Sequence, residues 1–280
     1  MTVASPTPRF RAASSAIAAS LLAWIPAFAA DTLDTALPAD EWRFEASLYG
    51  YLPKLHGTTS FPGFASNVTV DTSAIIDHLK FTFMGTLEAR RGSWGAFTDI
   101  LYVDLGGSKQ LIRGFGLGDF GLPAGAFASG SLDMKATLWT LAGTYRAIAQ
   151  PGATLDVLFG VRLLDIRQTL DWQLAGNVAT VAPPLRGGER ETSQSNWDGI
   201  VGIKGRVALS GDRRWFLPYY LDVGTGQSDS TWQAMTGIGY AFQWGDVIAG
   251  WRYLDYRMKS GRPIQDIGLS GGLLAVTMRW

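Results

Sequence analysis

The sequence ends on Leu274-Ala275-Val276-Thr277-Met278-Arg279-Trp280, and this stretch decides the predicted fold. Its apolar side chains alternate with small or polar ones, which predicts a β-strand with one apolar face. The apolar positions are Leu274, Val276, Met278 and Trp280. Because tryptophan is enriched where a membrane meets water, we expect this strand to lie in a membrane and to close a β-barrel.

The composition fits a membrane barrel better than a water-soluble domain. Charged residues make up 17% of the chain, below the roughly one quarter that is usual for soluble proteins. Glycine (34 residues) and aromatic residues (12%) are abundant, as closely packed strands and aromatic girdles require. The 24 basic and 24 acidic residues balance, so no nucleic-acid partner is expected. Cysteine is absent, which excludes disulfides and thiolate chemistry.

Residues 1–29 are predicted to be a secretory signal peptide. Arg9 and Arg11 form a short basic region, an apolar stretch follows, and Ala27-Phe28-Ala29 fits an A-x-A cleavage site. The alternative is an uncleaved anchor, although the apolar stretch is barely long enough to span a bilayer. An exported chain with no other long apolar stretch satisfies its backbone in lipid by closing a sheet.

The remaining chain is divided into a periplasmic lead over residues 30–41 and a barrel over residues 42–280. Alternating segments predict an all-β, antiparallel, up-and-down transmembrane barrel of ten strands. The segments begin at Trp42, Phe81, Trp94, Leu132, Leu155, Trp197, Trp215, Trp232, Val247 and Leu274. Short periplasmic turns are expected to alternate with longer extracellular loops, including residues 53–80, 106–131 and 168–196. Eight or twelve strands stay possible, as does a soluble sandwich or lipocalin-like barrel.

The positions opposite the apolar ones are expected to face the lumen, and many are charged. They are Arg43, Arg90, Arg162, Lys204, Arg206, Arg252, Glu45, Glu88, Asp99, Asp156, Asp198 and Asp222. Equal numbers of both signs favour cross-strand ion pairs, because a buried charge needs a partner. Side chains fill a barrel of about eight strands, whereas open channels appear near sixteen. We therefore expect a plugged or very narrow lumen.

One short motif, G-x-R-x-L-D-x, occurs twice. Its copies are Gly160-Val161-Arg162-Leu163-Leu164-Asp165-Ile166 and Gly250-Trp251-Arg252-Tyr253-Leu254-Asp255-Tyr256. Both lie at the outer end of a predicted strand, with arginine expected inward and aspartate at the outer rim. Val161 is expected to face lipid, and Leu164, on the other face, is expected to tolerate a polar replacement better.

The sequence lacks catalytic motifs. Hydrolysis would need a base beside a nucleophile or paired carboxylates, and the only histidines are His56 and His78, both in the first predicted loop. Neither GxSxG nor HExxH occurs. We therefore expect a protein without enzymatic activity, metal site or cofactor.

Several stretches resemble small outer-membrane β-barrel proteins of Gram-negative bacteria. They are Tyr49-Gly50-Tyr51-Leu52-Pro53, residues 81–90, Trp94-Gly95-Ala96-Phe97-Thr98-Asp99, Thr231-Trp232-Gln233-Ala234 and Gly250-Trp251-Arg252-Tyr253-Leu254. The resemblance implies an outer-membrane location and a barrel, but it brings no reaction and no catalytic residues to carry over.

Three functions stay open on this architecture: a structural or surface-interaction protein with a plugged lumen, a narrow channel for small polar solutes, and an envelope hydrolase acting through its extracellular loops. The expected partners are outer-membrane lipid and lipopolysaccharide, and the barrel-assembly machinery through the C-terminal strand. The protein is expected to be a monomer.

Overall fold

The computed structural model describes residues 41–61, 64–106, 126–176, 187–262 and 264–280. The predicted signal peptide and nearly all of the periplasmic lead lie outside these residues. Within the described ranges, the chain forms eleven strands and one short helix, α1 (Thr72–Asp77). No helix in the described part of the chain is long and apolar enough to cross a membrane.

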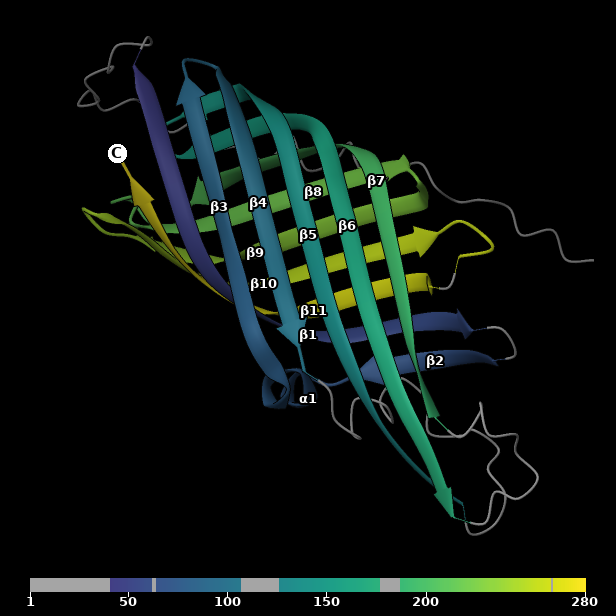
Figure 1. The fold of residues 1–280 in the computed structure, drawn as a ribbon. Coiled ribbons are helices and arrows are strands. Elements are labelled where there is room, and N and C mark those ends of the chain that lie inside the picture. The colour runs from purple at the N-terminus through teal and green to yellow at the C-terminus, as the bar shows by residue number, and fades with distance from the viewer. Residues whose placement is uncertain (1–40, 62–63, 107–125, 177–186, 263) are drawn as a thin grey trace, which may run out of the picture. The chain divides into compact units, whose positions relative to one another are not determined.

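Ten strands close into an antiparallel ring (Figure 1). They are β1 (Trp42–Phe61), β3 (Leu79–Arg91), β4 (Trp94–Leu105), β5 (Ala126–Gln150), β6 (Ala153–Gly176), β7 (Gly187–Ala208), β8 (Trp215–Gly226), β9 (Ser228–Ala241), β10 (Gly245–Met258) and β11 (Ile264–Arg279). Each strand pairs with the next, and β11 pairs with β1. The predicted ten-stranded barrel is confirmed, and the eight-stranded, twelve-stranded and sandwich alternatives are not observed in the described residues.

The C-terminal stretch closes this ring. The backbones of Trp280 and Phe44 exchange two hydrogen bonds, with N···O distances of 2.9 and 3.1 Å. Farther along, Leu48 lies opposite Val276. The four alternating apolar residues of the stretch are exposed on the outer face, as lipid contact requires: Leu274, Val276, Met278 and Trp280.

The three predicted loops are wrong for the described parts of these segments, which are mostly strand. β1 continues to Phe61, and its outer half pairs with β2 (Phe64–Val70), a short strand beside the ring. β5 and β6 stay paired up to Ala126 and Gly176, and β7 begins at Gly187. Residues 107–125 and 177–186, at the centres of two predicted loops, lie outside the described residues. His56 is therefore in a strand rather than a loop.

The long strands are taller than a bilayer core. At about 3.3 Å per residue and a tilt near 40°, the 25 residues of β5 rise about 60 Å. The apolar band of such a barrel is about 25 Å tall. The end with the short turns is periplasmic by the usual asymmetry of these proteins, so the additional height extends into the extracellular space.

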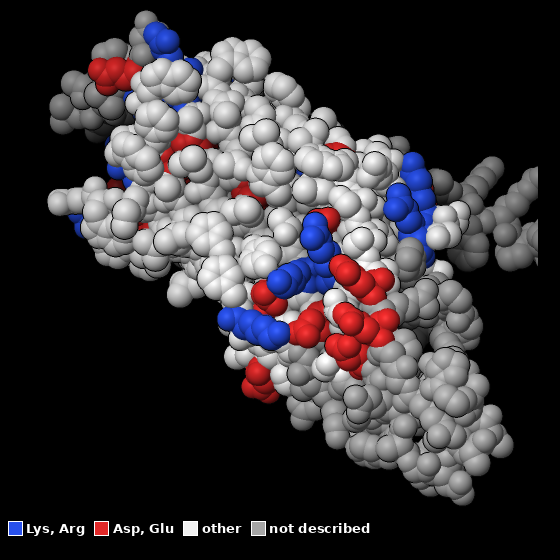
Figure 2. Space-filling view, viewed as in Figure 1, with Lys and Arg blue, Asp and Glu red and all other residues white. Residues whose placement is uncertain are grey.

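Beyond the apolar band, the outer face of the barrel wall becomes polar and the inner face becomes apolar. In β6, Phe159 and Val161 are exposed on the outer face, but Arg167 holds the equivalent outer position farther along. On the inner face of the same strand, buried Arg162 is followed by buried Leu164. In Figure 2, charged side chains gather at the lower right of the described surface, and the broad area to their upper left is mostly white.

The inside of the barrel therefore has two parts. Toward the extracellular end, buried apolar side chains from most of the ring form what we call the apolar core, which includes Met84, Leu101, Leu138, Leu164, Leu254, Tyr256, Ile264 and Leu273. Ala74 and Ile75 of α1 pack against it. Toward the periplasm, charged and hydrogen-bonding side chains predominate, and these form the candidate site.

Candidate functional site

Arg162 lies at the centre of the charged part of the lumen, and its side chain is 0% exposed. Its guanidinium contacts both carboxylate oxygens of Asp222 on β8, with one N···O distance of 2.8 Å. Its Nε donates to Thr140 Oγ1 on β5 at 3.1 Å, and a terminal nitrogen reaches the Tyr220 hydroxyl at 3.5 Å. This bidentate pair with additional hydrogen bonds is the arrangement that a buried arginine needs.

Arg252 holds the equivalent place in the second copy of the motif. One terminal nitrogen donates to Asp99 at 2.7 Å and to Gln233 at 2.9 Å, and the other donates to the Tyr49 hydroxyl at 2.8 Å. Tyr49 in turn donates to Asp99 at 2.6 Å. The network joins β1, β4, β9 and β10 across the lumen, so it braces strands that are not neighbours in the sheet.

A third cluster lies nearer the periplasm. Arg90 donates to Glu88 at 2.7 Å and to Asp156 at 2.6 Å. Lys204 pairs with the other oxygen of Glu88, and Arg146 forms two hydrogen bonds with Asp156. Arg146 was not among the predicted lumen residues, although it lies at inward parity beside Tyr145. That parity could have identified it from the sequence.

Nine of the twelve predicted lumen residues lie inside the barrel, and eight of these nine take part in the three clusters. The ninth, Asp198, is 1% exposed and accepts the backbone N–H of Ser228 at 2.9 Å. Asp198 lies directly opposite Arg162 in the β6–β7 pairing, yet Arg162 pairs with Asp222. Strand register alone therefore did not identify the partner.

The other three predicted residues lie at the periplasmic rim, because their strands end there, and this corrects the prediction. Arg43 is exposed. Glu45 accepts from Arg279 at 3.2 Å, and Arg206 lies 3.6 Å from Asp246 with about half of its side chain exposed. In the nearby turn between β7 and β8, a hydrogen bond from Ser210 lowers the pKa of Asp212 below its usual range.

The lumen is densely packed around these clusters. Ten inward-facing side chains have less than 2% of their surface exposed: Arg162, Tyr256, Leu158, Leu254, Asn196, Thr140, Thr144, Thr231, Thr277 and Asp156. No water-filled space therefore surrounds these ten side chains, as expected where a narrow barrel is packed with its own residues.

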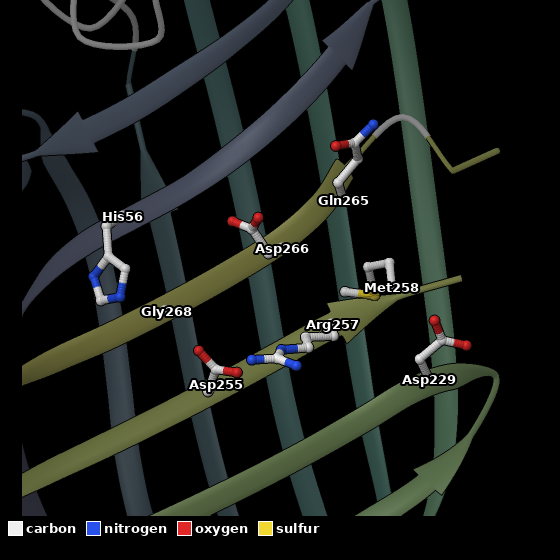
Figure 3. A pocket seen from close by; sticks show the side chains of 8 residues that line it. All are labelled: His56, Asp229, Asp255, Arg257, Met258, Gln265, Asp266 and Gly268. Atoms are coloured by element: carbon white, nitrogen blue, oxygen red, sulfur yellow. The ribbon is translucent and has the colours of Figure 1, made fainter. Parts of the chain in front are cut away.

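A second polar site, which we call the outer-wall pocket, lies on the outer face near the extracellular end (Figure 3). It has a volume of about 420 Å³ and is formed by β1, β9, β10 and β11. Its lining residues are His56, Asp229, Asp255, Arg257, Met258, Gln265, Asp266 and Gly268. Sequence analysis missed this pocket because its residues lie beyond the predicted ends of all four strands.

The two histidines lie in different elements. His56 is on β1 in the outer-wall pocket, whereas His78 directly follows α1. Among the described residues, no group of three or more histidine, cysteine or acidic residues is placed to hold a metal ion.

Solved structures that resemble this chain are bacterial outer-membrane barrels. The outer membrane protease OmpT from Escherichia coli has a TM-score of 0.46 at 9% identity, with 89% of this chain and 99% of that chain covered. Ail, the attachment invasion locus protein of Yersinia pestis, in complex with the heparin analogue sucrose octasulfate, has a TM-score of 0.34 at 9% identity, with 86% and 99% covered. The Pseudomonas putida toluene transporter TodX has a TM-score of 0.27 at 9% identity, with 87% and 90% covered.

No protein-family model and no curated protein matches the chain. The similarities above are too distant to indicate an activity. The fold itself defines the class of protein: the sheet closes on itself, and its outer face carries an apolar band with aromatic side chains at both edges. The lower edge includes Trp42, Trp94, Trp215 and Trp280, and the upper edge includes Phe81, Trp197, Trp232 and Trp251. The chain is an outer-membrane β-barrel protein.

Proposed function

We propose that this protein is a non-conducting outer-membrane barrel without enzymatic activity, which presents a rigid extracellular extension for surface interactions. The observation that carries the proposal is the closed interior, in which Arg162 is 0% exposed at the centre of the barrel. A buried guanidinium held by a bidentate carboxylate at this level supports a lumen that does not admit ions.

The extracellular extension supports the surface-interaction role. β5, β6 and β7 continue beyond the apolar band, and their outer faces there carry charged side chains such as Lys135, Asp165 and Arg167. The apolar core fills the inside of this extension. This folded, water-facing wall is not needed to span the membrane. Its ordered structure above the membrane therefore supports a role in binding at the cell surface.

Single-channel recording in planar bilayers tests the proposal. The purified barrel is expected to give no steady conductance, whereas an open porin in the same bilayer serves as the positive control. Arg162→Met and Arg252→Met are also expected to stay silent, because neighbouring side chains still fill the lumen. A steady, ion-selective current through the wild-type barrel would replace this proposal with the narrow-channel alternative.

The expectation that the protein lacks enzymatic activity has its own test. The purified protein should show no hydrolase activity on envelope substrates, and any activity found should be unchanged in His56→Ala and His78→Ala. Loss of such an activity in either variant, with the barrel still folded by circular dichroism, would favour the hydrolase alternative.

A further inference from the structure

The outer-wall pocket has no role in the closed lumen, and its position and charges indicate a ligand. We propose that it binds the head group of an outer-leaflet lipid that carries both a primary ammonium and a phosphate. The proposal needs the membrane location of the barrel, but it does not depend on whether the lumen conducts.

Its depth follows from the aromatic side chains below it. On β10, Trp251 is 56% exposed on the outer face, and Tyr253 packs on Trp232 with ring centroids 4.6 Å apart. Tryptophan and tyrosine in such rows lie at the level of the lipid head groups. Asp255 is the next outward residue on β10, about 7 Å farther along the strand. The pocket therefore begins where acyl chains end.

Its shape follows from one glycine. His56, Gly268 and Asp255 lie directly opposite one another on β1, β11 and β10. The His56 imidazole lies over Gly268, and a Cβ at that position would collide with the ring. The glycine thus lets the imidazole lie across β11, where it borders the pocket on the side opposite Asp255 (Figure 3). A volume of about 420 Å³ is within the range of small-molecule sites.

Its charges are of both signs. Arg257 lies directly opposite Asp266 on the neighbouring strand, yet Arg257 has no ion pair among the described residues. Within the described ranges, Asp255 accepts one hydrogen bond, a long one of 3.3 Å from the Tyr253 hydroxyl. Asp229 adds a third carboxylate at the edge of the pocket. The pocket therefore offers carboxylates and a guanidinium side by side to a ligand with both charges.

An ammonium-phosphate head group matches this arrangement. A primary ammonium has three N–H donors, which the carboxylates of Asp255 and Asp266 accept, and a phosphate is the preferred ligand of a guanidinium such as Arg257. Neighbouring strands are about 4.8 Å apart, a distance that an ethanolamine group bridges between its nitrogen and its phosphate. A choline head group keeps the charges but has no N–H to donate, and a glycerol head group has no ammonium.

Native mass spectrometry of the detergent-solubilised full-length barrel tests the proposal. The probes are phosphatidylethanolamine, its N,N-dimethyl derivative, phosphatidylcholine and phosphatidylglycerol with the same acyl chains. We expect one phosphatidylethanolamine per barrel, with retention falling as N–H donors are removed, and phosphatidylglycerol retained least. Equal retention of phosphatidylglycerol and phosphatidylethanolamine would overturn the proposal.

Two variants assign the binding to the pocket. Asp255→Asn combined with Asp266→Asn removes the charge-assisted hydrogen bonds, and retention of phosphatidylethanolamine should fall about tenfold or more. Asp165→Asn is the matched control, because this outward aspartate holds the equivalent motif position on β6 and lies outside the pocket. Equal losses in the pocket variant and the control would overturn the proposal.

The remaining outcomes also decide the question. Binding that disappears when EDTA is added would mean that a divalent cation occupies the pocket, and the head-group proposal would fail. If the double variant did not fold, Gly268→Ala would test the same site by displacing the His56 ring that borders it. Failure of these lipid tests would leave the conductance result untouched, and a conducting lumen would leave the lipid result untouched.

Discussion

The two parts of the barrel interior are closed by opposite chemistries. At the level of the apolar band, Arg162 and Arg252 point into the lumen and pair with buried carboxylates and hydroxyls. Above that level, Leu164, Leu254 and Tyr256 fill the same lumen with apolar contacts. The same strands build both parts, so the strand geometry does not explain the difference.

The solvent outside the wall explains it. Where the wall faces lipid, apolar side chains point outward, and the polar side chains of each strand point into the lumen, where the charged ones pair across it. Where the wall faces water, charged side chains point outward, and burial of apolar surface stabilises the sheet as in a soluble protein. The molecule therefore combines an inverted membrane barrel with an ordinary water-facing barrel in one continuous sheet.

The repeated motif lies at the transition between these two parts. In both copies, the arginine points inward and takes part in the ionic clusters, whereas the next inward residue, Leu164 or Leu254, belongs to the apolar core. The aspartates, Asp165 and Asp255, point outward above the lipid. The motif thus marks the level at which the membrane ends.

The largest effect is expected from breaking the ionic part. Arg162→Met leaves Asp222 buried and without its partner, which should lower the free energy of unfolding by about 3–5 kcal/mol. Urea unfolding of the barrel in lipid vesicles, followed by tryptophan fluorescence, measures the change. Arg257→Met, on the outer wall, should have a much smaller effect.

A double variant separates the charge from the packing. Arg162→Met combined with Asp222→Leu removes both buried charges and should recover most of the lost stability. If the double variant were as unstable as Arg162→Met alone, the ion pair would not be what stabilises this part of the lumen.

A similar effect with a different cause is expected in the apolar core. Leu254 is 1% exposed, so Leu254→Ala should cost about 2–5 kcal/mol through a cavity, whereas Leu254→Met should cost less than about 1.5 kcal/mol. The same unfolding measurement applies. A polar residue at Leu164 should also be costly, contrary to the expectation from the sequence, because Leu164 contacts the apolar core rather than water.

The barrel in the membrane could be predicted from the sequence, whereas the apolar core around Leu164 could not. The ring, its closing strand and the inward arginines followed from the alternation in residues such as Phe159 and Val161, because lipid contact imposes one rule over a whole strand. The extension was missed because that rule reverses outside the membrane: in β7, Glu191 and Ser193 are exposed on the outer face, whereas Gln194 is buried on the inner face. Polar outward positions such as these were therefore interpreted as loop.

Partner choice within the site was also beyond the sequence. Parity placed Arg162, Asp198 and Asp222 on the inner face, but the reach and direction of the guanidinium select Asp222 on β8. The outer-wall pocket depends on four strands at a level where the chain was expected to be irregular. The choice of ion-pair partner and the presence of this pocket both depend on three-dimensional positions that the sequence pattern does not give.

The outer face gives an intermediate effect that locates the membrane boundary. Val161→Arg should cost about 2–4 kcal/mol in lipid vesicles, because a charge would then face the middle of the apolar band. Ser193→Arg, on the outer face of β7 above the transition, should change stability by no more than about 0.5 kcal/mol. Similar costs at both positions would mean that the apolar band extends farther than the motif indicates.

The smallest effect concerns a single hydroxyl that links the two sides of the lumen. Tyr49 donates to Asp99 and accepts from Arg252, so Tyr49→Phe removes one hydrogen bond to each charged partner while the Arg252–Asp99 pair remains. Removing hydrogen bonds to charged groups typically costs about 1.5–3 kcal/mol, and the surviving ion pair should hold the loss near the lower value.

Tyr51→Phe is the matched control, because the Tyr51 hydroxyl donates to the backbone oxygen of Arg252 at 3.2 Å, a longer bond to an uncharged acceptor. Unfolding in lipid vesicles should therefore rank Tyr49→Phe below the wild type by more than Tyr51→Phe. The reverse ranking would show that the ionic part is held by packing around Arg252 rather than by the hydrogen bonds of its charged groups.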